Sequence, residues 1–327
     1  MRAVAFHDAG AVERWLDYPG CIAAMRQAMR SVSEVGKVQP LRQIVALTDG
    51  ALFGVMPGDL GAIGTFGAKL VSVAGDPVRS GRSRHQGVVV AFDAHTHAVT
   101  CIADAEAVTT IRTACATAAA TDALARKDAK VLAIFGTGTQ ARAHIRALCL
   151  VRRFDRIVLW GRSAARTADR AAQLSAELSA DLGVAIEAVA DGRDAAGMAD
   201  VICTVSGSAE PVVLGDWVRA GTHVNLVGSS FLGPVEVDTA LVAAARYIAD
   251  YRAGVLAQAS ELAAAREAGA VDDAHVVGEI GEVFAGTLAG REDDRQITIY
   301  KSLGHVAQDL AAAAYLHARA TSESAAA

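Results

Sequence analysis

The clearest chemical motif in the chain is the glycine-rich segment Gly136-Thr137-Gly138-Thr139-Gln140-Ala141. It follows a short apolar run, residues 130–135, and opens a stretch with helical periodicity. In such a turn Gly136 permits the sharp change of direction, Gly138 lets a pyrophosphate approach the backbone, and Ala141 lets the helix pack close to the sheet. Free N–H groups at the helix start then attract phosphate oxygens. The arrangement predicts a dinucleotide site, with a plain glycine-rich turn as the alternative.

The end of the next expected strand, residues 156–160, bears on which dinucleotide binds. An NAD site usually carries Asp or Glu about 20 residues after the glycines, where the carboxylate accepts from the ribose 2′-hydroxyl. Here Gly161-Arg162-Ser163-Ala164-Ala165-Arg166 follows, with no carboxylate. Arg162 and Ser163 can instead hold a 2′-phosphate through charge-assisted hydrogen bonds. We therefore expect NADPH, with NADH as the alternative and a solvated turn as the competing interpretation of Arg162.

Small residues follow two later strands of the same region. Thr204-Val205-Ser206 closes one strand, and Val227-Gly228-Ser229-Ser230 closes the next. In open α/β sheets, ligands bind beyond the carboxyl ends of the strands. The residues expected to leave room for the nicotinamide and its ribose are Thr204, Ser206, Val227 and Gly228.

The order of expected elements indicates an α/β protein with two domains. Strands alternate with helices through the middle of the chain, which is typical of a doubly wound, Rossmann-type sheet. The expected strands are 130–135, 156–160, 184–189, 201–205, 223–227 and 247–249, with helices at 139–150 and 164–180. The first 120 residues form an α+β unit, with helices at about 11–18, 20–33 and 104–126 and strands at 43–47, 51–56, 67–73 and 87–92. Because a C-terminal helix at about 302–319, after a strand-like 296–300, can return to this unit, we expect a discontinuous domain of residues 1–118 and 300–327 beside a Rossmann domain of residues 119–299.

Composition narrows the class of protein. The 327 residues carry a net charge of −5 with scattered arginines, so no nucleic-acid-binding patch is visible. No apolar run approaches the roughly 20 residues of a membrane span, and the N-terminus lacks the apolar core of a secretory signal. The five cysteines show no metal or redox spacing. His95 and His97 lie in an expected hairpin turn without a third ligand, so no metal is expected. A cytoplasmic protein with buried free thiols fits these features.

Several motifs together resemble the ornithine cyclodeaminase/mu-crystallin family, and in particular its ketimine reductases. In chain order they are Val38-Gln39-Pro40-Leu41-Arg42, Val55-Met56-Pro57, Gly67-Ala68-Lys69-Leu70-Val71, His85-Gln86-Gly87-Val88-Val89, residues 107–114, the Gly136 segment, residues 279–283 and residues 297–304. The resemblance runs from about residue 20 to 315. It implies a Rossmann domain joined to a discontinuous substrate-binding and dimerisation domain, and hence a homodimer that acts on a small imino or amino acid.

The resemblance also implies roles for particular residues. Arg42 and Lys69 would bind the substrate carboxylate, since a guanidinium grips a carboxylate through two parallel hydrogen bonds. Lys69, partly desolvated beside Arg42, would have a lowered pKa and could move a proton. Arg112, within a helix of small residues, would meet a cofactor phosphate or the substrate carboxylate. Further residues would line the cofactor (Gln86, Thr139, Gln140, Ser302) or the substrate (Leu303).

Three other titratable side chains are given different interpretations. His305 could neighbour the site as a proton donor. Asp309 and Glu282 are interpreted as structural helix charges.

One departure from the family's cyclodeaminases lies at Ser230. The resemblance implies an aspartate there in cyclodeaminases, where it handles the amino group during ring closure. A serine hydroxyl carries no charge near neutral pH, so it cannot stabilise or deprotonate an ammonium as a carboxylate does. With Lys69, Ser230 would help to keep the substrate nitrogen protonated, by holding a water, while Phe231 beside it would shape an apolar pocket.

The resulting hypothesis is reduction, by NADPH or NADH, of the C=N bond of an α-imino acid. The substrate would be a cyclic ketimine such as pyrroline- or piperideine-2-carboxylate, or an open-chain imino acid, and the product an L-amino acid. The alternatives are an ornithine cyclodeaminase-type lyase that forms proline and ammonia, and a non-catalytic, mu-crystallin-like ligand carrier.

Overall fold

The computed structural model describes residues 4–34, 39–48, 50–73, 85–230 and 232–324 of the chain. The chain forms two compact units, Met1–Ala116 with His305–Ala327, and Thr117–Gly304. Helix α3 (Ala105–Leu124) runs from the first unit into the second. Among the residues described, no helix has both the length and the apolar character that a membrane crossing requires.

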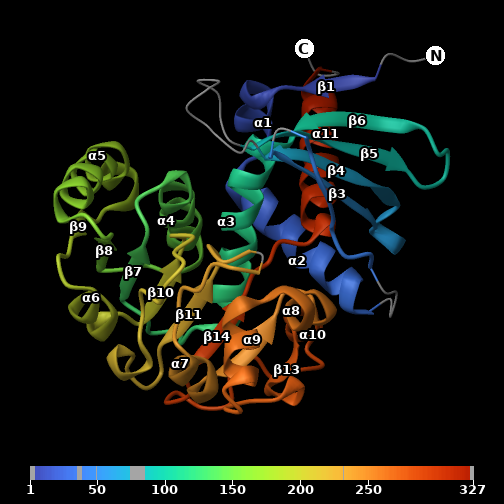
Figure 1. The fold of residues 1–327 in the computed structure, drawn as a ribbon. Coiled ribbons are helices and arrows are strands. Elements are labelled where there is room, and N and C mark those ends of the chain that lie inside the picture. Colours follow the sequence, from blue (N-terminus) through green and yellow to red (C-terminus); the bar gives the residue numbers. More distant parts are fainter. Residues whose placement is uncertain (1–3, 35–38, 49, 74–84, 231, 325–327) are drawn as a thin grey trace. The chain divides into compact units, whose positions relative to one another are not determined.

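The first unit is built on a six-stranded sheet in the order β1-β6-β5-β4-β3-β2 (Figure 1). Its strands are β1 (Ala5–His7), β2 (Gln43–Ala46), β3 (Leu52–Asp59), β4 (Thr65–Val73), β5 (His85–Asp93) and β6 (Val99–Asp104). β1 pairs with β6 in parallel and the other pairs are antiparallel. The C-terminal helix α11 (Val306–Ser324) packs against β3, β4, β5 and β6 and against α2 (Tyr18–Glu34), while α1 (Ala9–Trp15) packs on α11 and β6. The last helix therefore completes the core that the first hundred residues begin.

The expected hairpin between β5 and β6 is present. The Asp93 carboxylate accepts from the backbone N–H groups of His95 and Thr96, and His97 has a positive φ of 58°. The sequence pattern missed β1 and β6, which are short and lie at one side of the sheet. His95 and His97 therefore lie in a turn, as expected.

The second unit is a doubly wound domain with an eight-stranded parallel sheet in the order β13-β12-β14-β11-β10-β7-β8-β9 (Figure 1). Its strands are β7 (Val131–Phe135), β8 (Arg156–Trp160), β9 (Ile186–Ala188), β10 (Val201–Thr204), β11 (His223–Leu226), β12 (Arg246–Ala249), β13 (Val276–Glu279) and β14 (Thr298–Lys301). Its helices are α4 (Thr139–Val151), α5 (Ala164–Leu182), α6 (Gly192–Met198), α7 (Thr239–Ala244), α8 (Arg252–Gln258), α9 (Ser260–Glu267) and α10 (Ile280–Ala285). The strands β7 and β10 are almost entirely apolar because helices cover both faces of such sheets, whereas the neighbouring strands β11 and β14 bury polar side chains as well, among them Asn225 and Lys301. Strand order reverses between β7 and β10, the switch point where ligands bind in open α/β sheets.

The last strand changes the expected domain boundary. β14 lies between β11 and β12, so a boundary at residues 299/300 would cut a central strand. The division instead follows Gly304, whose φ is 81° and whose N–H donates to the Asp250 carboxylate. The C-terminal helix consequently begins at Val306 rather than at Ser302, because the Ser302 N–H still donates to Leu226 O beside the sheet.

Candidate functional site

The glycine turn of the second unit has the geometry of a pyrophosphate cradle. Gly136 has a φ of 138°, and a Cβ there would lie 2.8 Å from the Val205 carbonyl oxygen. Gly138 is the N-cap of α4, and a Cβ on it would meet no atom within 4 Å. Ala141 is fully buried, which fits its expected role in helix packing. The fold of the turn therefore requires glycine at position 136. At position 138 a side chain would fit without a clash, so the glycine there leaves space for a ligand next to the backbone.

The first turn of α4 adds polar groups to this space. Thr139 is exposed at the helix start, as the cofactor interpretation expects. The side-chain oxygen Oε1 of Gln140 is buried and has no hydrogen-bond partner among the described residues. A buried acceptor left without a donor costs free energy unless a ligand or water supplies one. These residues therefore fit a bound dinucleotide.

The loops after β10 and β11 are tied together by one buried carboxylate, Glu236, which the sequence analysis did not single out. Glu236 accepts from the Thr204 hydroxyl at 2.8 Å and from the N–H and hydroxyl of Ser206, both at 2.7 Å. It also accepts from the N–H groups of Gly228 and Ser229 at 2.8 and 3.2 Å. Thr204 and Ser206 thus direct their hydroxyls to Glu236, and their contribution to a cofactor site stays a prediction.

A second buried network holds Ser229, the residue before Ser230. Lys301 and Glu261 form an ion pair of 3.0 Å in which neither side chain is exposed to solvent. Lys301 Nζ also donates to the carbonyl and the hydroxyl of Ser229, at 2.6 and 2.5 Å, and the Ser229 hydroxyl in turn donates to Glu261. Ser230 itself is half-buried. The strand β14 therefore anchors the segment that carries Ser230, whereas Phe231 lies outside the described residues.

The other residues of the second unit that were predicted to bind cofactor or substrate lie after the strands β8, β11 and β14. Val227 is buried at the carboxyl end of β11, and the Ser302 hydroxyl is buried without a partner among the residues described. Leu303 is 7% exposed and belongs to the apolar core of the second unit, so its part in substrate binding stays a prediction. Arg162 is exposed after β8, and the Ser163 hydroxyl caps α5 by accepting from the Arg166 N–H.

The first unit holds a buried cluster around Lys69, on β4. Its ammonium donates to the Thr109 hydroxyl at 2.6 Å and pairs with the Asp309 carboxylate at 3.3 Å. Arg112 Nε reaches the same carboxylate oxygen at 3.0 Å, and Arg112 Nη1 donates to Gln308 Oε1 at 2.6 Å. In the structure, Arg112 thus has protein partners on α11, and a contact with a cofactor phosphate or a substrate carboxylate stays a prediction. The second oxygen of Asp309, Oδ2, is buried with no hydrogen-bond partner in the described chain.

Burial sets the protonation chemistry of this cluster. The pKa of Lys69 falls from 10.5 to about 8, mainly through burial and also through the charges of Arg112 and Arg42, while the Asp309 carboxylate opposes these effects. Lys69 therefore still carries its proton at neutral pH and can release it within the range in which enzymes work. Arg42 is half-buried just before β2, close enough to act electrostatically on Lys69.

Three further titratable side chains are Asp309 and His305, which follow β14, and Glu282 of α10. Asp309, interpreted from the sequence as a structural helix charge, is the shared partner of two buried cations, Lys69 and Arg112. Glu282 is confirmed as structural, since it forms the capping box of α10 with Glu279. His305 lies near the Lys69 cluster, and burial lowers its pKa to about 4, so its ring is neutral at physiological pH.

Two glutamines of the sequence motifs, Gln39 and Gln86, lie in different settings in the first unit. The Gln39 side chain donates to the Asp59 carbonyl at 2.9 Å and so fixes the segment that leads to Arg42. Gln86 is exposed on β5 opposite Ser72, and its role toward a cofactor stays a prediction. Val38 lies outside the described residues.

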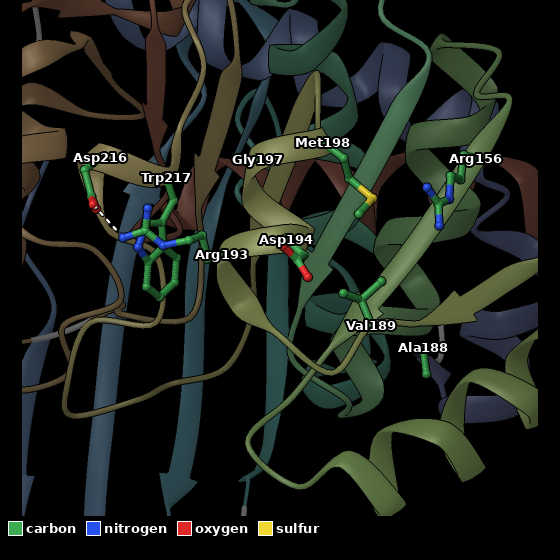
Figure 2. A pocket seen from close by; sticks show the side chains of 9 residues that line it. All are labelled: Arg156, Ala188, Val189, Arg193, Asp194, Gly197, Met198, Asp216 and Trp217. Atoms are coloured by element: carbon green, nitrogen blue, oxygen red, sulfur yellow. Dashed lines mark hydrogen bonds and ion pairs between the residues drawn. The ribbon is translucent and has the colours of Figure 1, made fainter.

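An open hollow in the second unit is unrelated to these groups (Figure 2). It lies along α6 beside the 3₁₀ helix Gly215–Trp217, where Arg193 stacks on Trp217 and pairs with Asp216 at 2.7 Å. Its walls contain none of the residues predicted to bind cofactor or substrate.

Comparison with known proteins now identifies the group to which these features belong. The sequence profile of the ornithine cyclodeaminase/mu-crystallin family matches residues 3–324. The chain belongs to this family. It is 31% identical over 281 residues to the ketimine reductase mu-crystallin of Mus musculus, covering 85% of this chain and 84% of the relative.

Two solved structures of this family share the whole fold. The Δ1-pyrroline-2-carboxylate reductase of Thermococcus litoralis, in complex with NADH and L-proline, has a TM-score of 0.90 and 28% identity, with 98% of each chain covered. The iminosuccinate reductase of Paracoccus denitrificans, in complex with NAD+, has a TM-score of 0.91 and 28% identity, covering 99% of this chain and 98% of that one. The family resemblance and fold class expected from the sequence are thereby confirmed.

Proposed function

We propose that this protein is an NAD(P)H-dependent reductase that converts an α-imino acid into an L-amino acid. The observation that carries the proposal is the buried Lys69–Asp309–Arg112 cluster in a chain that also has a complete dinucleotide turn. Two buried cations, Lys69 and Arg112, share the single carboxylate of Asp309, and the charge of Arg42 also acts on Lys69, so the cluster suits a substrate carboxylate. The reductase names of the relatives and the cofactors and L-proline bound in the two solved structures support the same reaction class.

The chain's own residues would bind the substrate and manage one proton. Arg42 offers a planar fork of donors to the carboxylate, and Lys69 adds a point charge. The reduced nicotinamide supplies the hydride when bound. Because a protonated imine is a stronger electrophile than a neutral one, the Lys69 ammonium would keep the substrate nitrogen protonated, with a water held by Ser230 as the second donor. Asp309 would keep Lys69 charged by countering the cost of its burial.

The dinucleotide turn fits both forms of the cofactor. We assign NADPH as the preferred one because no carboxylate follows β8 directly and Arg162 is exposed there. NADH remains the alternative, and the bound NADH and NAD+ of the two solved relatives support it.

A cytoplasmic homodimer is proposed for the assembly. The strand β2 is exposed along its whole length, and its Ile44 and Val45 side chains are 54% and 51% exposed. An exposed apolar strand at a sheet edge is a surface that proteins usually cover. We therefore expect the parent protein to have the molar mass of a dimer and the Val45→Lys variant that of a monomer, as measured by light scattering.

Assays of the purified protein test the reaction. We expect the protein to consume NADPH or NADH when pyrroline-2-carboxylate, piperideine-2-carboxylate or an open-chain imino acid is added. The loss of absorbance of the reduced cofactor measures this consumption. Proline and ammonia from ornithine without net cofactor change would instead establish the lyase. Cofactor binding with neither reaction would leave the ligand carrier.

The Arg42→Ala variant tests the carboxylate assignment. Loss of a charged hydrogen bond of about 1.5–3 kcal/mol lowers kcat/KM by roughly 10- to 100-fold. The control is Arg30→Ala, which removes an exposed cation of α2 paired only with Glu34 in the described contacts. Near-normal turnover by Arg42→Ala would refute the assignment.

A further inference from the structure

A group of three metal-binding side chains lies in the first unit, apart from the Lys69 cluster. The ligand atoms of His7, Cys101 and His317 all lie within 4.8 Å of one another. His7 and Cys101 are buried, and His317 is half-buried. His7 and His317 are separated by 310 positions in the sequence, so no spacing pattern could have shown this group.

Three elements bring these side chains together. His7 lies on β1 opposite Ala103 of β6, and Ala5 lies opposite Cys101, so His7 and Cys101 share one face of the sheet. The same face meets α11, where the Cys101 thiol approaches the Ala313 carbonyl oxygen at 3.7 Å. His317 follows Ala313 by one helical turn and reaches the His7 ring. The group thus joins the first strand, a later strand and the last helix.

The distances resemble those of a tetrahedral zinc site. His7 Nε2 and His317 Nδ1 are 3.1 Å apart. Two imidazole nitrogens at about 2.0–2.1 Å from a tetrahedral zinc ion are separated by about 3.3 Å. A thiolate at about 2.3 Å from the metal lies about 3.6 Å from each nitrogen, which a small adjustment of the Cys101 side chain provides.

The chemistry of the ligands points to the same class of ion. Burial lowers the pKa of His7, with the charge of His317 as a further cause, and burial lowers the pKa of His317. Both rings are therefore neutral near pH 7, which is the form that binds metals. Two imidazoles and a thiolate suit zinc and disfavour calcium or magnesium, which take oxygen ligands.

We propose that His7, Cys101 and His317 bind one Zn²⁺ ion, with a water as the fourth ligand on the half-exposed side of His317. Burial raises the pKa of the Cys101 thiol to about 11, so on binding the thiol passes its proton to solvent and the sulfur becomes a thiolate ligand. The ion would fix α11 to β1 and β6. Because Asp309 lies two turns earlier on α11, about 12 Å along the helix, the metal would also steady the helix that supports Lys69.

Cobalt binding to the chelator-treated, full-length protein tests the site. We expect one equivalent of Co²⁺ to bind, with a thiolate-to-cobalt charge-transfer band, and Zn²⁺ to displace it. Cys101→Ser should abolish that band, and His317→Ala should weaken binding at least tenfold. Cys149→Ser, which removes a half-buried thiol of α4 in the second unit, should bind cobalt like the parent protein.

A stability measurement keeps the test independent of folding defects in the variants. Zn²⁺ should raise the melting temperature of the parent protein, and His317→Ala, which alters the most exposed ligand, should lose that rise while remaining folded by circular dichroism. Absence of saturable cobalt binding by the folded parent protein would overturn the proposal. Equal affinity in the parent, Cys101→Ser and His317→Ala proteins would overturn it as well.

Discussion

Lys69 and Asp309 are 240 positions apart in the sequence, yet the Lys69 ammonium lies 3.3 Å from the Asp309 carboxylate in a pair that is almost fully buried. The same carboxylate oxygen accepts from Arg112 at 3.0 Å. A buried charge without a partner is strongly unfavourable, so each member of this group depends on the others. The charge of Asp309 therefore both stabilises the fold and sets the protonation of Lys69.

Asp309→Asn should change the pH dependence of the reductase. In the parent protein, activity should fall as pH rises through about 8, because Lys69 then loses its proton. Asp309 raises the pKa of Lys69, so removing its charge lowers that pKa and moves the alkaline loss of activity to lower pH. The variant should also lose about 3–5 kcal/mol of unfolding free energy. Rate profiles against pH, with urea unfolding, measure both effects.

The control for this variant is Asp181→Asn, at an exposed position of α5. It should leave the rate profile and the unfolding curve unchanged. An unshifted alkaline limb in Asp309→Asn would show that Lys69 does not supply the proton.

The two glycines of the dinucleotide turn should respond differently to alanine. Gly138→Ala meets no protein atom within 4 Å, so unfolding free energy should fall by less than about 1 kcal/mol while cofactor affinity drops at least tenfold. Gly136→Ala forces a non-glycine residue to a φ of 138° and against the Val205 carbonyl, so stability itself should fall by about 1–3 kcal/mol. Calorimetric titration with NADPH measures the cofactor affinity of each variant, and unfolding in urea measures its stability. If Gly138→Ala bound cofactor like the parent, the pyrophosphate would not approach there.

Glu236→Gln should loosen the loops after β10 and β11. The carboxylate accepts from Thr204, Ser206, Gly228 and Ser229, and an amide would turn an NH₂ group toward these donors. Each buried donor left without an acceptor costs about 1–3 kcal/mol, so the melting temperature and cofactor affinity should both fall. Glu210→Gln, at an exposed residue of the same segment, is the matched control. Unchanged cofactor affinity in Glu236→Gln would separate this network from the binding site.

Arg162→Ala tests the preference between the two cofactors. If Arg162 holds the 2′-phosphate, kcat/KM for NADPH should fall by roughly 10- to 100-fold, the equivalent of one charged hydrogen bond, while the value for NADH stays the same. Arg153→Ala removes another exposed cation of this unit and should affect neither cofactor. Equal losses with both cofactors would contradict a 2′-phosphate contact.

Local signals in the sequence predicted the strands β7 to β12 of the second unit, but not β13 or the place of β14 in its sheet. An apolar run before Gly136, a helix after it and the repeated alternation of strands and helices depend on neighbours in the chain, and the structure shows those elements within a few residues of the expected bounds. The motif around Lys69 is also visible in the sequence, whereas the ion pair of Arg112 with Asp309 is not indicated by it.

Which charges lie together depends on how distant parts of the chain pack. Asp309, Glu236, Glu261 and Lys301 look like ordinary helix, loop or strand charges in the sequence, and burial against distant elements gives them their partners. The place of β14 between β11 and β12, and the meeting of His7 with His317, follow in the same way from strand order and from the return of the last helix. Local patterns report how a segment folds, whereas electrostatic partners are set by the free energy of burying charges together, which depends on the whole packed chain.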